Sequence, residues 1–226
     1  MSGVRIAIVI PVRNGADFLG DALAGVLGQS RAPDEVVVVD DGSTDATAAT
    51  AGRFAPRVRV LASPRRGPAA ARNAGIAATT SELIGFLDHD DLMEPGALAV
   101  QEALALSDPT PDAVVGRTLR LRRAAPGLAF VAEGAPYRAI SFGASLVRRS
   151  AFAAAGPIDE SRLHGEDVAW FGRAAAVGLR IVVHDAVVQR YRLHEKNLTN
   201  DAERNRAGFF GALREVARGR AAGTAP

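Results

Sequence analysis

The stretch Leu83-Ile84-Gly85-Phe86-Leu87-Asp88-His89-Asp90-Asp91 decides the fold of this chain, because an apolar run ends in it at three carboxylates. Residues 83–87 have the pattern of a buried strand, and they best fit a central strand of a parallel sheet. Buried carboxylates destabilise a protein unless a cation or hydrogen-bond donors compensate them. Ligand crevices of open α/β sheets lie just outside the carboxyl ends of the strands. Residues 88–90 therefore predict a place where a divalent metal ion and a phosphorylated ligand meet. The alternative is an acidic strand–helix turn with Asp90 or Asp91 as an N-cap.

Strand and helix patterns alternate before this run. Apolar, β-branched segments predict strands at 4–10, 35–39 and 58–61, and helical spacing predicts helices at 16–29, from about 44 to 54, and at 67–78. This alternation indicates a three-layer α/β arrangement with a parallel, right-handed central sheet. The second strand also ends in a carboxylate pair, Asp40-Asp41. Both acidic clusters are therefore expected at the same edge of the sheet.

The pattern changes after residue 91. The sequence predicts helices at 94–106, 148–155, 165–177 and 201–218, and strands at 113–121, 141–147, 180–184 and 186–190. Residues 120–138 carry no clear pattern. We expect one domain over 1–218, with a nucleotide-binding half at 1–91, an acceptor-binding half at 92–218, and a flexible tail at 219–226.

Composition narrows the function classes. The 226 residues are 48% hydrophobic with a net charge of +2, which argues against a nucleic-acid partner. The absence of cysteine excludes disulfides and Cys-ligated zinc, and fits a reducing cytoplasm. No apolar stretch approaches bilayer length and no signal-peptide pattern opens the chain, so a cytoplasmic protein is expected.

Common catalytic motifs are missing. There is no Gly-x-Gly-x-x-Gly, no phosphate loop ending in Gly-Lys-Ser/Thr, and no nucleophile elbow, so dehydrogenase and hydrolase functions lose support. A receiver-type phospho-acceptor domain needs a lysine at a strand end, and the single lysine, Lys196, falls in a predicted loop. A nucleotidyltransferase would open with a Gly-rich basic loop, which residues 11–15 do not provide.

Several short motifs together resemble the family 2 glycosyltransferases of the GT-A fold, over most of the chain. They are Val9-Ile10-Pro11-Val12-Arg13-Asn14, Val38-Val39-Asp40-Asp41-Gly42-Ser43-Thr44-Asp45, Ala70-Ala71-Arg72-Asn73-Ala74-Gly75, Phe86-Leu87-Asp88-His89-Asp90-Asp91, Gly165-Glu166-Asp167 and Tyr191-Arg192-Leu193-His194. Each motif alone is weak, and their order and spacing are specific.

The resemblance implies a donor site for a nucleotide-diphospho-sugar. Asp90 would ligate Mn²⁺ or Mg²⁺, Asp88 would touch the ribose or a metal-bound water, and His194 would complete the metal shell or contact the diphosphate. The remaining nucleotide-binding positions would be Pro11, Val12, Arg13, Asn14, Asp40, Asp41, Arg72 and His89, with Asp40 accepting from a uracil-type base and His89 as the spacer of the metal motif. Arg13 departs from the family, in which an aromatic residue is frequent at this position, although a guanidinium can also stack on a base.

The same resemblance makes Asp167 the general base of an inverting transfer, since a carboxylate must take the proton of the attacking acceptor hydroxyl. The structural alternative is that Glu166 and Asp167 only stabilise the helix that begins with them, through their favourable interaction with its dipole. Glu166 and Trp170 are candidate acceptor contacts, with a core role for Trp170 as the alternative. We expect residues 119–140 to determine which acceptor is bound.

The implied function is a metal-dependent inverting glycosyltransferase, with a UDP-sugar favoured as donor and a hydroxyl acceptor. The acceptor would be a glycan, a lipid-linked intermediate or a small glycoside, as in surface polysaccharide or glycoconjugate synthesis. A lipid-linked acceptor would be met by peripheral contact at the inner face of the membrane. The alternatives are a non-catalytic nucleotide-sugar-binding relative and a nucleotidyltransferase.

Overall fold

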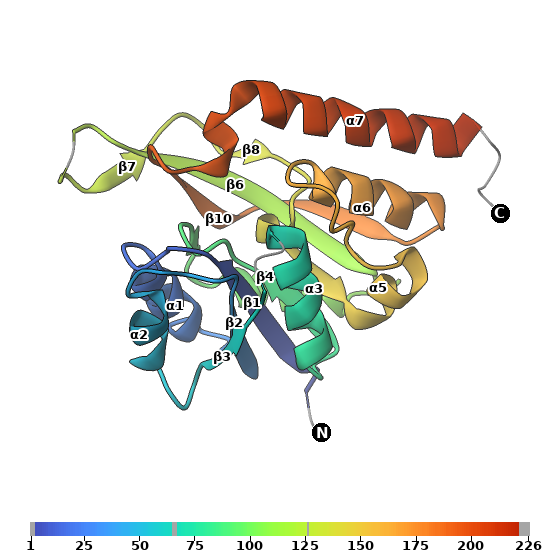
Figure 1. Cartoon of the computed structure of the whole chain (residues 1–226). Helices are drawn as coiled ribbons and strands as arrows, with labels where there is room; N and C mark the ends of the chain where they lie inside the picture. Colours follow the sequence, from blue (N-terminus) through green and yellow to red (C-terminus); the bar gives the residue numbers. More distant parts are fainter. Residues whose placement is uncertain (1–2, 65–66, 126, 222–226) are drawn as a thin grey trace.

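The computed structural model describes residues 3–64, 67–125 and 127–221. One ten-stranded sheet runs through the molecule (Figure 1). Eight of its strands follow the order β3-β2-β1-β4-β9-β6-β10-β5, and the other two, β7 and β8, pair with β6. The α/β class with a mostly parallel central sheet is as predicted from the sequence.

The amino-terminal half is a parallel α/β unit. β1 (Ile6–Val12), buried over its whole length, lies between β2 (Glu35–Asp40) and β4 (Leu83–Phe86), and β3 (Arg59–Ala62) extends the sheet beyond β2. Helices α1 (Leu19–Leu27) and α2 (Thr47–Gly52) lie on one side of these strands, and α3 (Pro68–Ala78) lies on the other (Figure 1). The predicted alternation of strands and helices up to residue 87 is confirmed.

The carboxyl-terminal half is a mixed extension of the sheet. β5 (Leu92–Met93) and α4 (Ala97–Ala105) follow the acidic turn, then β6 (Ala113–Arg123), the 3-10 helix η1 (Phe142–Ala144), β9 (Ser145–Arg148) and α5 (Arg149–Ala155). The last elements are α6 (Glu166–Ala176), β10 (Ile181–Leu193), the 3-10 helix η2 (Leu198–Asn200) and α7 (Ala202–Ala221). β9 joins the halves, because it is antiparallel to both β4 and β6.

Three segments differ from the sequence prediction. The unpatterned stretch 120–138 contains the end of β6 and two short strands, β7 (Phe130–Ala132) and β8 (Tyr137–Arg138), both antiparallel to β6. The two strands expected at 180–190 are one strand, β10, whose register with β6 shifts between Val183 and Gln189. Helix α7 continues through Ala221, so residues 219–221 of the predicted tail are helical, and the rest of that prediction, residues 222–226, lies outside the described part of the chain.

An aromatic cluster fills the core between the sheet and helices α5 and α6. Trp170 is fully buried against Phe142, Phe152 and Phe171, with ring centroids 4.7–5.5 Å away, and its indole N–H donates to the carbonyl of Gly156 (2.9 Å). The expectation that Trp170 contacts an acceptor is therefore wrong, because a side chain with no exposed surface cannot meet a ligand. The core alternative holds.

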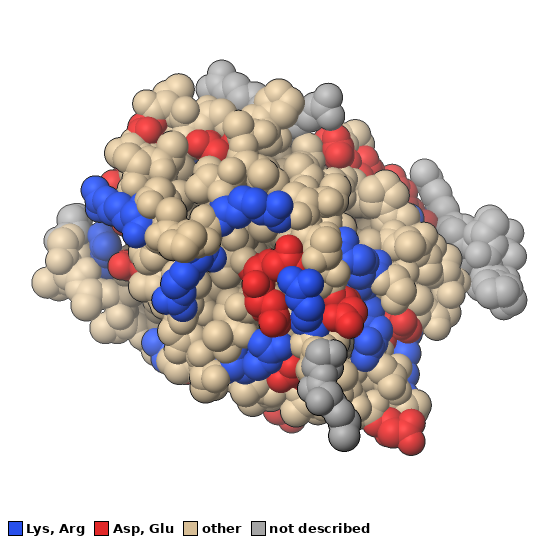
Figure 2. Space-filling model, turned by 90° about the horizontal axis from the view of Figure 1, so that it is seen from below, with Lys and Arg blue, Asp and Glu red and all other residues tan. Residues whose placement is uncertain are grey.

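The surface carries no dominant charge on the face of Figure 2, where acidic side chains at the centre are surrounded by basic ones. Ion pairs near the starts of β1 and β2 have the same mixed character: Arg5–Glu35 (3.5 Å), Arg31–Asp34 (3.0 Å) and Arg59–Glu35 (3.8 Å). Among the described residues, no helix combines the length and the apolar character needed to cross a bilayer.

Candidate functional site

The predicted acidic clusters meet at the carboxyl edge of the parallel strands. The register places Val12 of β1 beside Asp40 of β2, and the Asp41 N–H donates to the Val12 carbonyl (2.8 Å). On the other side of β1, Leu87 follows β4 and its N–H donates to Val9 (3.2 Å), so Asp88 begins at the same edge. The parallel strands β2 and β4, on either side of β1, thus bring their carboxylates to one edge of the sheet, as the sequence predicted.

The loops after β1 and β2 hold each other. Asn14 has a left-handed backbone (φ 52°), its N–H donates to the Ser43 hydroxyl (2.9 Å), and its side-chain oxygen accepts from the Thr44 N–H (2.8 Å). One carboxylate oxygen of Asp40 accepts from the Ser43 N–H (2.8 Å), which is a turn-forming bond. None of the described residues bonds to the other carboxylate oxygen of Asp40, so the turn role and a base-binding role are compatible.

The other predicted nucleotide positions differ in accessibility. Pro11 and Val12 are buried strand residues, whereas Arg13 is exposed. Asp41 is buried, and its carboxylate accepts from the Gly67 N–H at the start of α3 (2.8 Å). His89 packs directly against Gly15, where a Cβ would lie only 2.3 Å from the imidazole. These contacts give the loop after β1 a fixed shape next to the acidic turn.

Arg72 connects the two halves of the site. From the middle of α3 it donates to Asp88 (2.6 Å) and to Glu166 (2.8 Å), and only 7% of its side chain is exposed. Burial disfavours the charged guanidinium, but Asp88, Glu166 and Asp167 around it raise its pKa above the ordinary value. Glu166 is itself buried, so it supports the site through Arg72, and its predicted acceptor contact stays a prediction.

Asp167 has an electrostatic environment suited to a base. It is partly buried in the first turn of α6 and accepts a hydrogen bond from the Val168 N–H (2.7 Å). Burial, followed by the adjacent Glu166 carboxylate, raises its pKa to about 6, while the Val168 bond and Arg72 act in the opposite direction. A carboxylate with a pKa near 6 holds a proton better than an ordinary aspartate and is still ionised at neutral pH.

Asp90 and His194 form a pair 104 residues apart in the sequence. The Asp90 carboxylate lies 3.1 Å from His194 Nε2, and the Lys196 N–H donates to the other ring nitrogen, Nδ1 (3.2 Å). Burial alone would raise the pKa of Asp90, but the hydrogen bond with His194 and the charges of His89 and His194 bring it below the ordinary value. Asp90 is therefore held as a carboxylate.

Asp91 has a different role from its two neighbours. It is fully buried and accepts from the Gln189 side chain (2.6 Å) and the Arg192 N–H (2.9 Å), so it fastens the acidic turn to β10. Burial, followed by the charges of Asp90 and Asp88, raises the pKa of Asp91 well above its ordinary value. The N-cap alternative is not observed, because residues 92–93 form β5 and the next helix is capped at Gly96.

The donor atoms fit a metal ion that shares its shell with a ligand. In the parts of the chain that the structure describes, no group of three or more His, Asp or Glu side chains converges on one point. Mg²⁺ characteristically takes one or two protein carboxylates and completes its shell with phosphate oxygens and water. Adjacent ligands of an octahedral shell with bonds of about 2.1 Å lie about 3 Å apart, close to the 3.1 Å between Asp90 and His194.

The model of glycosyl transferase family 2 matches residues 7–123, just over half of the chain. The chain belongs to this family. Among curated relatives, the succinoglycan biosynthesis protein ExoU of Rhizobium meliloti is 47% identical over 98 residues, which cover 41% of this chain and 28% of the relative. Chondroitin synthase of Pasteurella multocida is 34% identical over 108 residues, which cover 46% of this chain and 11% of that protein.

Solved structures show that the family 2 chain has the GT-A glycosyltransferase fold. TarS of Staphylococcus aureus (residues 1–349, in complex with UDP-GlcNAc) has a TM-score of 0.77 at 20% identity, and the match covers 94% of this chain and 65% of TarS 1–349. The mannosyltransferase PcManGT of Pyrobaculum calidifontis, in complex with GDP-Man and Mn²⁺, also has a TM-score of 0.77 at 20% identity, with coverage of 96% and 65%. The family 2 chain thus spans less than two thirds of these solved chains, and about a quarter to a third of the first curated relatives.

Sequence reasoning gave no site role to three residues around the Asp90–His194 pair, although Arg192 and Asn197 lie in the family-like segment around His194. Asn197 is buried and contacts both Asp90 and His194, and Phe18 stacks on the His194 ring at 4.4 Å. The Arg192 guanidinium lies over Phe18 (4.9 Å) and bonds to Asp21 (3.0 Å). The only available signal was that Arg192 and Asn197 flank His194 within the family-like segment.

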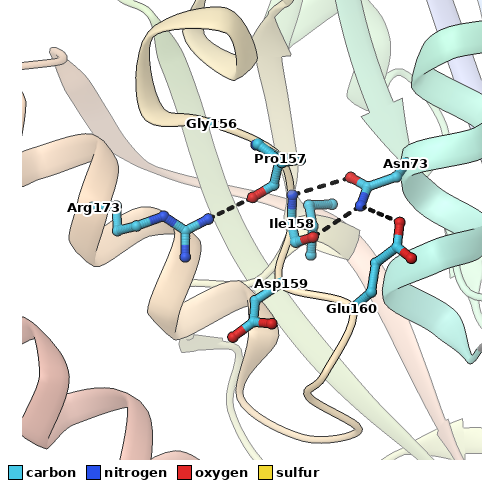
Figure 3. Close-up of a pocket in the computed structure, with 7 residues that line it drawn as sticks. All are labelled: Asn73, Gly156, Pro157, Ile158, Asp159, Glu160 and Arg173. Carbon is cyan, nitrogen blue, oxygen red and sulfur yellow. Dashed lines mark hydrogen bonds between the residues drawn. The ribbon is translucent and has the colours of Figure 1, made fainter.

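A shallow pocket of about 410 Å³ lies away from this family 2 site, between α3, α6 and the loop 156–160. Asn73 exchanges two hydrogen bonds with the backbone of Ile158 and donates to Glu160, and Arg173 donates to the Pro157 carbonyl (Figure 3). These polar groups are paired with one another. The loop thereby ties α3, which carries Arg72, to α6, which carries Asp167.

Proposed function

We propose that this family 2 chain is a metal-dependent, inverting glycosyltransferase that moves a sugar from a nucleoside diphosphate to a hydroxyl acceptor. The observation that carries the proposal is that one chain of contacts links a donor-side carboxylate, Asp90, with an acceptor-side carboxylate, Asp167. Asp90, held ionised beside His194, follows Asp88 in the turn, and Asp88 is joined through Arg72 to the helix start that carries Asp167. The transfer needs one carboxylate that holds a metal ion at the leaving diphosphate and another that takes the proton of the attacking hydroxyl.

The donor half is the region around the acidic turn. Asp90 and His194 would hold Mn²⁺ or Mg²⁺, which supplies Lewis-acid stabilisation of the negative charge on the departing diphosphate. Asp40, with one free carboxylate oxygen at the same edge, would accept from the N–H of the base, and a UDP-sugar is the favoured donor. The complexes of TarS with UDP-GlcNAc and of PcManGT with GDP-Man and Mn²⁺ support a nucleotide-sugar donor.

The acceptor half is the region of α6. Asp167 would take the proton of the acceptor hydroxyl as its oxygen attacks the anomeric carbon, which inverts the configuration there. The Arg72–Glu166 ion pair (2.8 Å) would keep the helix start that carries this carboxylate beside the donor site. The exposed hairpin β6–β7 and strand β8 would select the acceptor, and the succinoglycan relative supports a polysaccharide or its precursor.

The test is nucleotide binding by calorimetry, with UDP, GDP, dTDP and CDP, each in Mn²⁺ and then in EDTA. Metal-dependent binding of one nucleotide, with UDP expected, supports the donor site. Asp90→Ala should abolish the dependence on metal. His194→Gln separates two roles of the histidine, since glutamine can donate to Asp90 but removes the imidazole ligand. Binding of no nucleotide by the folded protein would overturn the proposal.

A further inference from the structure

Asn197 occupies a position from which it can set the geometry of the Asp90–His194 pair. Its side chain is 6% exposed and lies between the turn after β4 and the loop after β10. The amide nitrogen donates to the Asp90 carboxylate oxygen that faces His194 (3.3 Å) and to the Arg192 carbonyl (3.1 Å). The amide oxygen accepts from the His194 backbone N–H (2.6 Å). A single planar group therefore touches both members of the pair.

The His194 ring is held from a second direction. Phe18, just before α1, stacks on the imidazole with ring centroids 4.4 Å apart and an interplanar angle of 20°. The Arg192 guanidinium lies on Phe18, 4.9 Å from its centroid, and donates to the Phe18 carbonyl (3.3 Å). The histidine is thus held by the Phe18 ring on one side and by Asn197, which accepts from the His194 backbone N–H and whose amide nitrogen also lies 3.3 Å from His194 Nε2.

We infer that Asn197 is a positioning residue that pre-assembles Asp90 and His194 for a divalent cation, an inference that rests on the proposed function. Two ligands from segments about 100 residues apart lose conformational freedom when a metal joins them, and a preformed pair avoids most of that loss. The geometry assigns this task to Asn197, because among the described residues it bonds to the Asp90 carboxylate and to the His194 backbone together. Removing such a supporting hydrogen bond typically lowers metal affinity by about 10- to 100-fold.

The experiment measures nucleotide affinity across a Mn²⁺ titration in wild type and in Asn197→Ala. The variant should require about 10- to 100-fold more Mn²⁺ to reach half of the metal effect. Its nucleotide affinity in EDTA and its circular dichroism should match those of the wild type. A merely structural role would instead weaken metal-free nucleotide binding and the melting temperature together, without a shift in the Mn²⁺ midpoint.

Asn200→Ala is the matched control. Asn200 is an exposed asparagine in the same loop, and among the described residues its amide donates to the carbonyls of His194 and Glu195 (2.9 Å each) and not to Asp90. It should keep the wild-type Mn²⁺ midpoint. If Asn197→Ala does not fold, Asn197→Ser serves instead, because its shorter side chain keeps a polar group near the His194 N–H and loses the amide donor to Asp90.

The outcomes separate the inference from the function on which it rests. If the wild type shows no Mn²⁺-dependent nucleotide binding, the proposed donor site fails. If the wild type shows it and Asn197→Ala has the same Mn²⁺ midpoint, the positioning role of Asn197 is wrong. Equal shifts in Asn197→Ala and Asn200→Ala would also overturn it, since loop order and not the amide contact would then set the metal affinity.

Discussion

At the scale of single residues, the site is a set of carboxylates with different protonation behaviour. The hydrogen bond with His194 keeps the pKa of Asp90 below its ordinary value, burial raises the pKa of Asp91 well above it, and burial raises the pKa of Asp167 to about 6. These three aspartates differ only in surroundings, because burial favours the neutral form whereas donors and cations favour the anion. Local environment therefore gives one residue type three kinds of behaviour, which suit the proposed metal ligand, a structural anchor and the proposed base.

Asp167→Asn should separate activity from stability. Turnover should fall by two to four orders of magnitude, roughly, while nucleotide affinity stays near that of the wild type. The raised pKa means that ionised Asp167 destabilises the fold at every pH above about 6. The neutral amide should therefore raise the free energy of unfolding at pH 8 by on the order of 1–3 kcal/mol. Transfer assays and urea titrations measure both, and equal loss of turnover and donor binding would remove Asp167 as the base.

At the scale of elements, the packing of α3 on β1 fixes Arg72. Gly75, one turn after Arg72, lets the helix approach Val9 so closely that a Cβ there would lie 2.2 Å from a Val9 methyl. The close approach of α3 to β1 helps to place Arg72 within 2.6 Å of Asp88. A helix glycine, which lowers intrinsic helix stability by about 1 kcal/mol relative to alanine, is therefore used here for packing.

Gly75→Ala should destabilise the protein by about 1–3 kcal/mol, because overpacking outweighs the gain in helix propensity. Gly52→Ala, at the end of α2, is the control, since no atom lies within 4 Å of its added Cβ. That control should be neutral or stabilise by up to about 1 kcal/mol. Urea unfolding of both variants measures the difference, and a stable Gly75→Ala would show that α3 shifts freely on β1.

At the scale of the whole molecule, two groups of carboxyls act on stability in opposite directions. Burial, followed by neighbouring carboxylates, raises the pKa of Asp91 and of Asp167. Burial alone would also raise the pKa of Asp34 and of Glu35, but hydrogen bonds bring both pKa values below the ordinary value. Asp34 accepts from the Ile6 N–H and from Arg31, and Glu35 accepts from Ser81 and Thr80. The first group binds protons more tightly in the folded state, and the second group binds them less tightly.

The free energy of unfolding should therefore pass through a maximum between about pH 4 and 5. As the pH falls from about 6 toward 5, the folded protein takes up more protons than the unfolded chain, so stability rises. Below about pH 4.5 the unfolded chain protonates first at Asp34 and Glu35, and stability falls. Urea titrations between pH 3 and 8 measure the curve. Asp167→Asn should flatten its upper limb, and a stability that only increases from pH 5 to 8 would contradict the assignment.

The sequence by itself determined the amino-terminal half of this protein. Strand periodicity, turn residues and the acidic clusters after β2 and β4 are local patterns, and parallel strands necessarily bring their carboxyl ends to one edge. The fold class, the family resemblance and the meeting of Asp40, Asp41 and Asp88 at one edge could be read from them. The ends of helices and strands were predicted less accurately than their existence, because caps depend on contacts outside the segment.

Only the tertiary structure decided how the second half completes the site. Arg72 meets Glu166 across 94 residues and Asn197 meets Asp90 across 107, and no periodicity within either segment encodes such contacts. The short strands β7 and β8 exist because β6 extends far enough to pair with them, and Trp170 is buried because the aromatic cluster closes around it. Local pattern fixes backbone periodicity, whereas burial and pairing depend on what the rest of the chain places alongside.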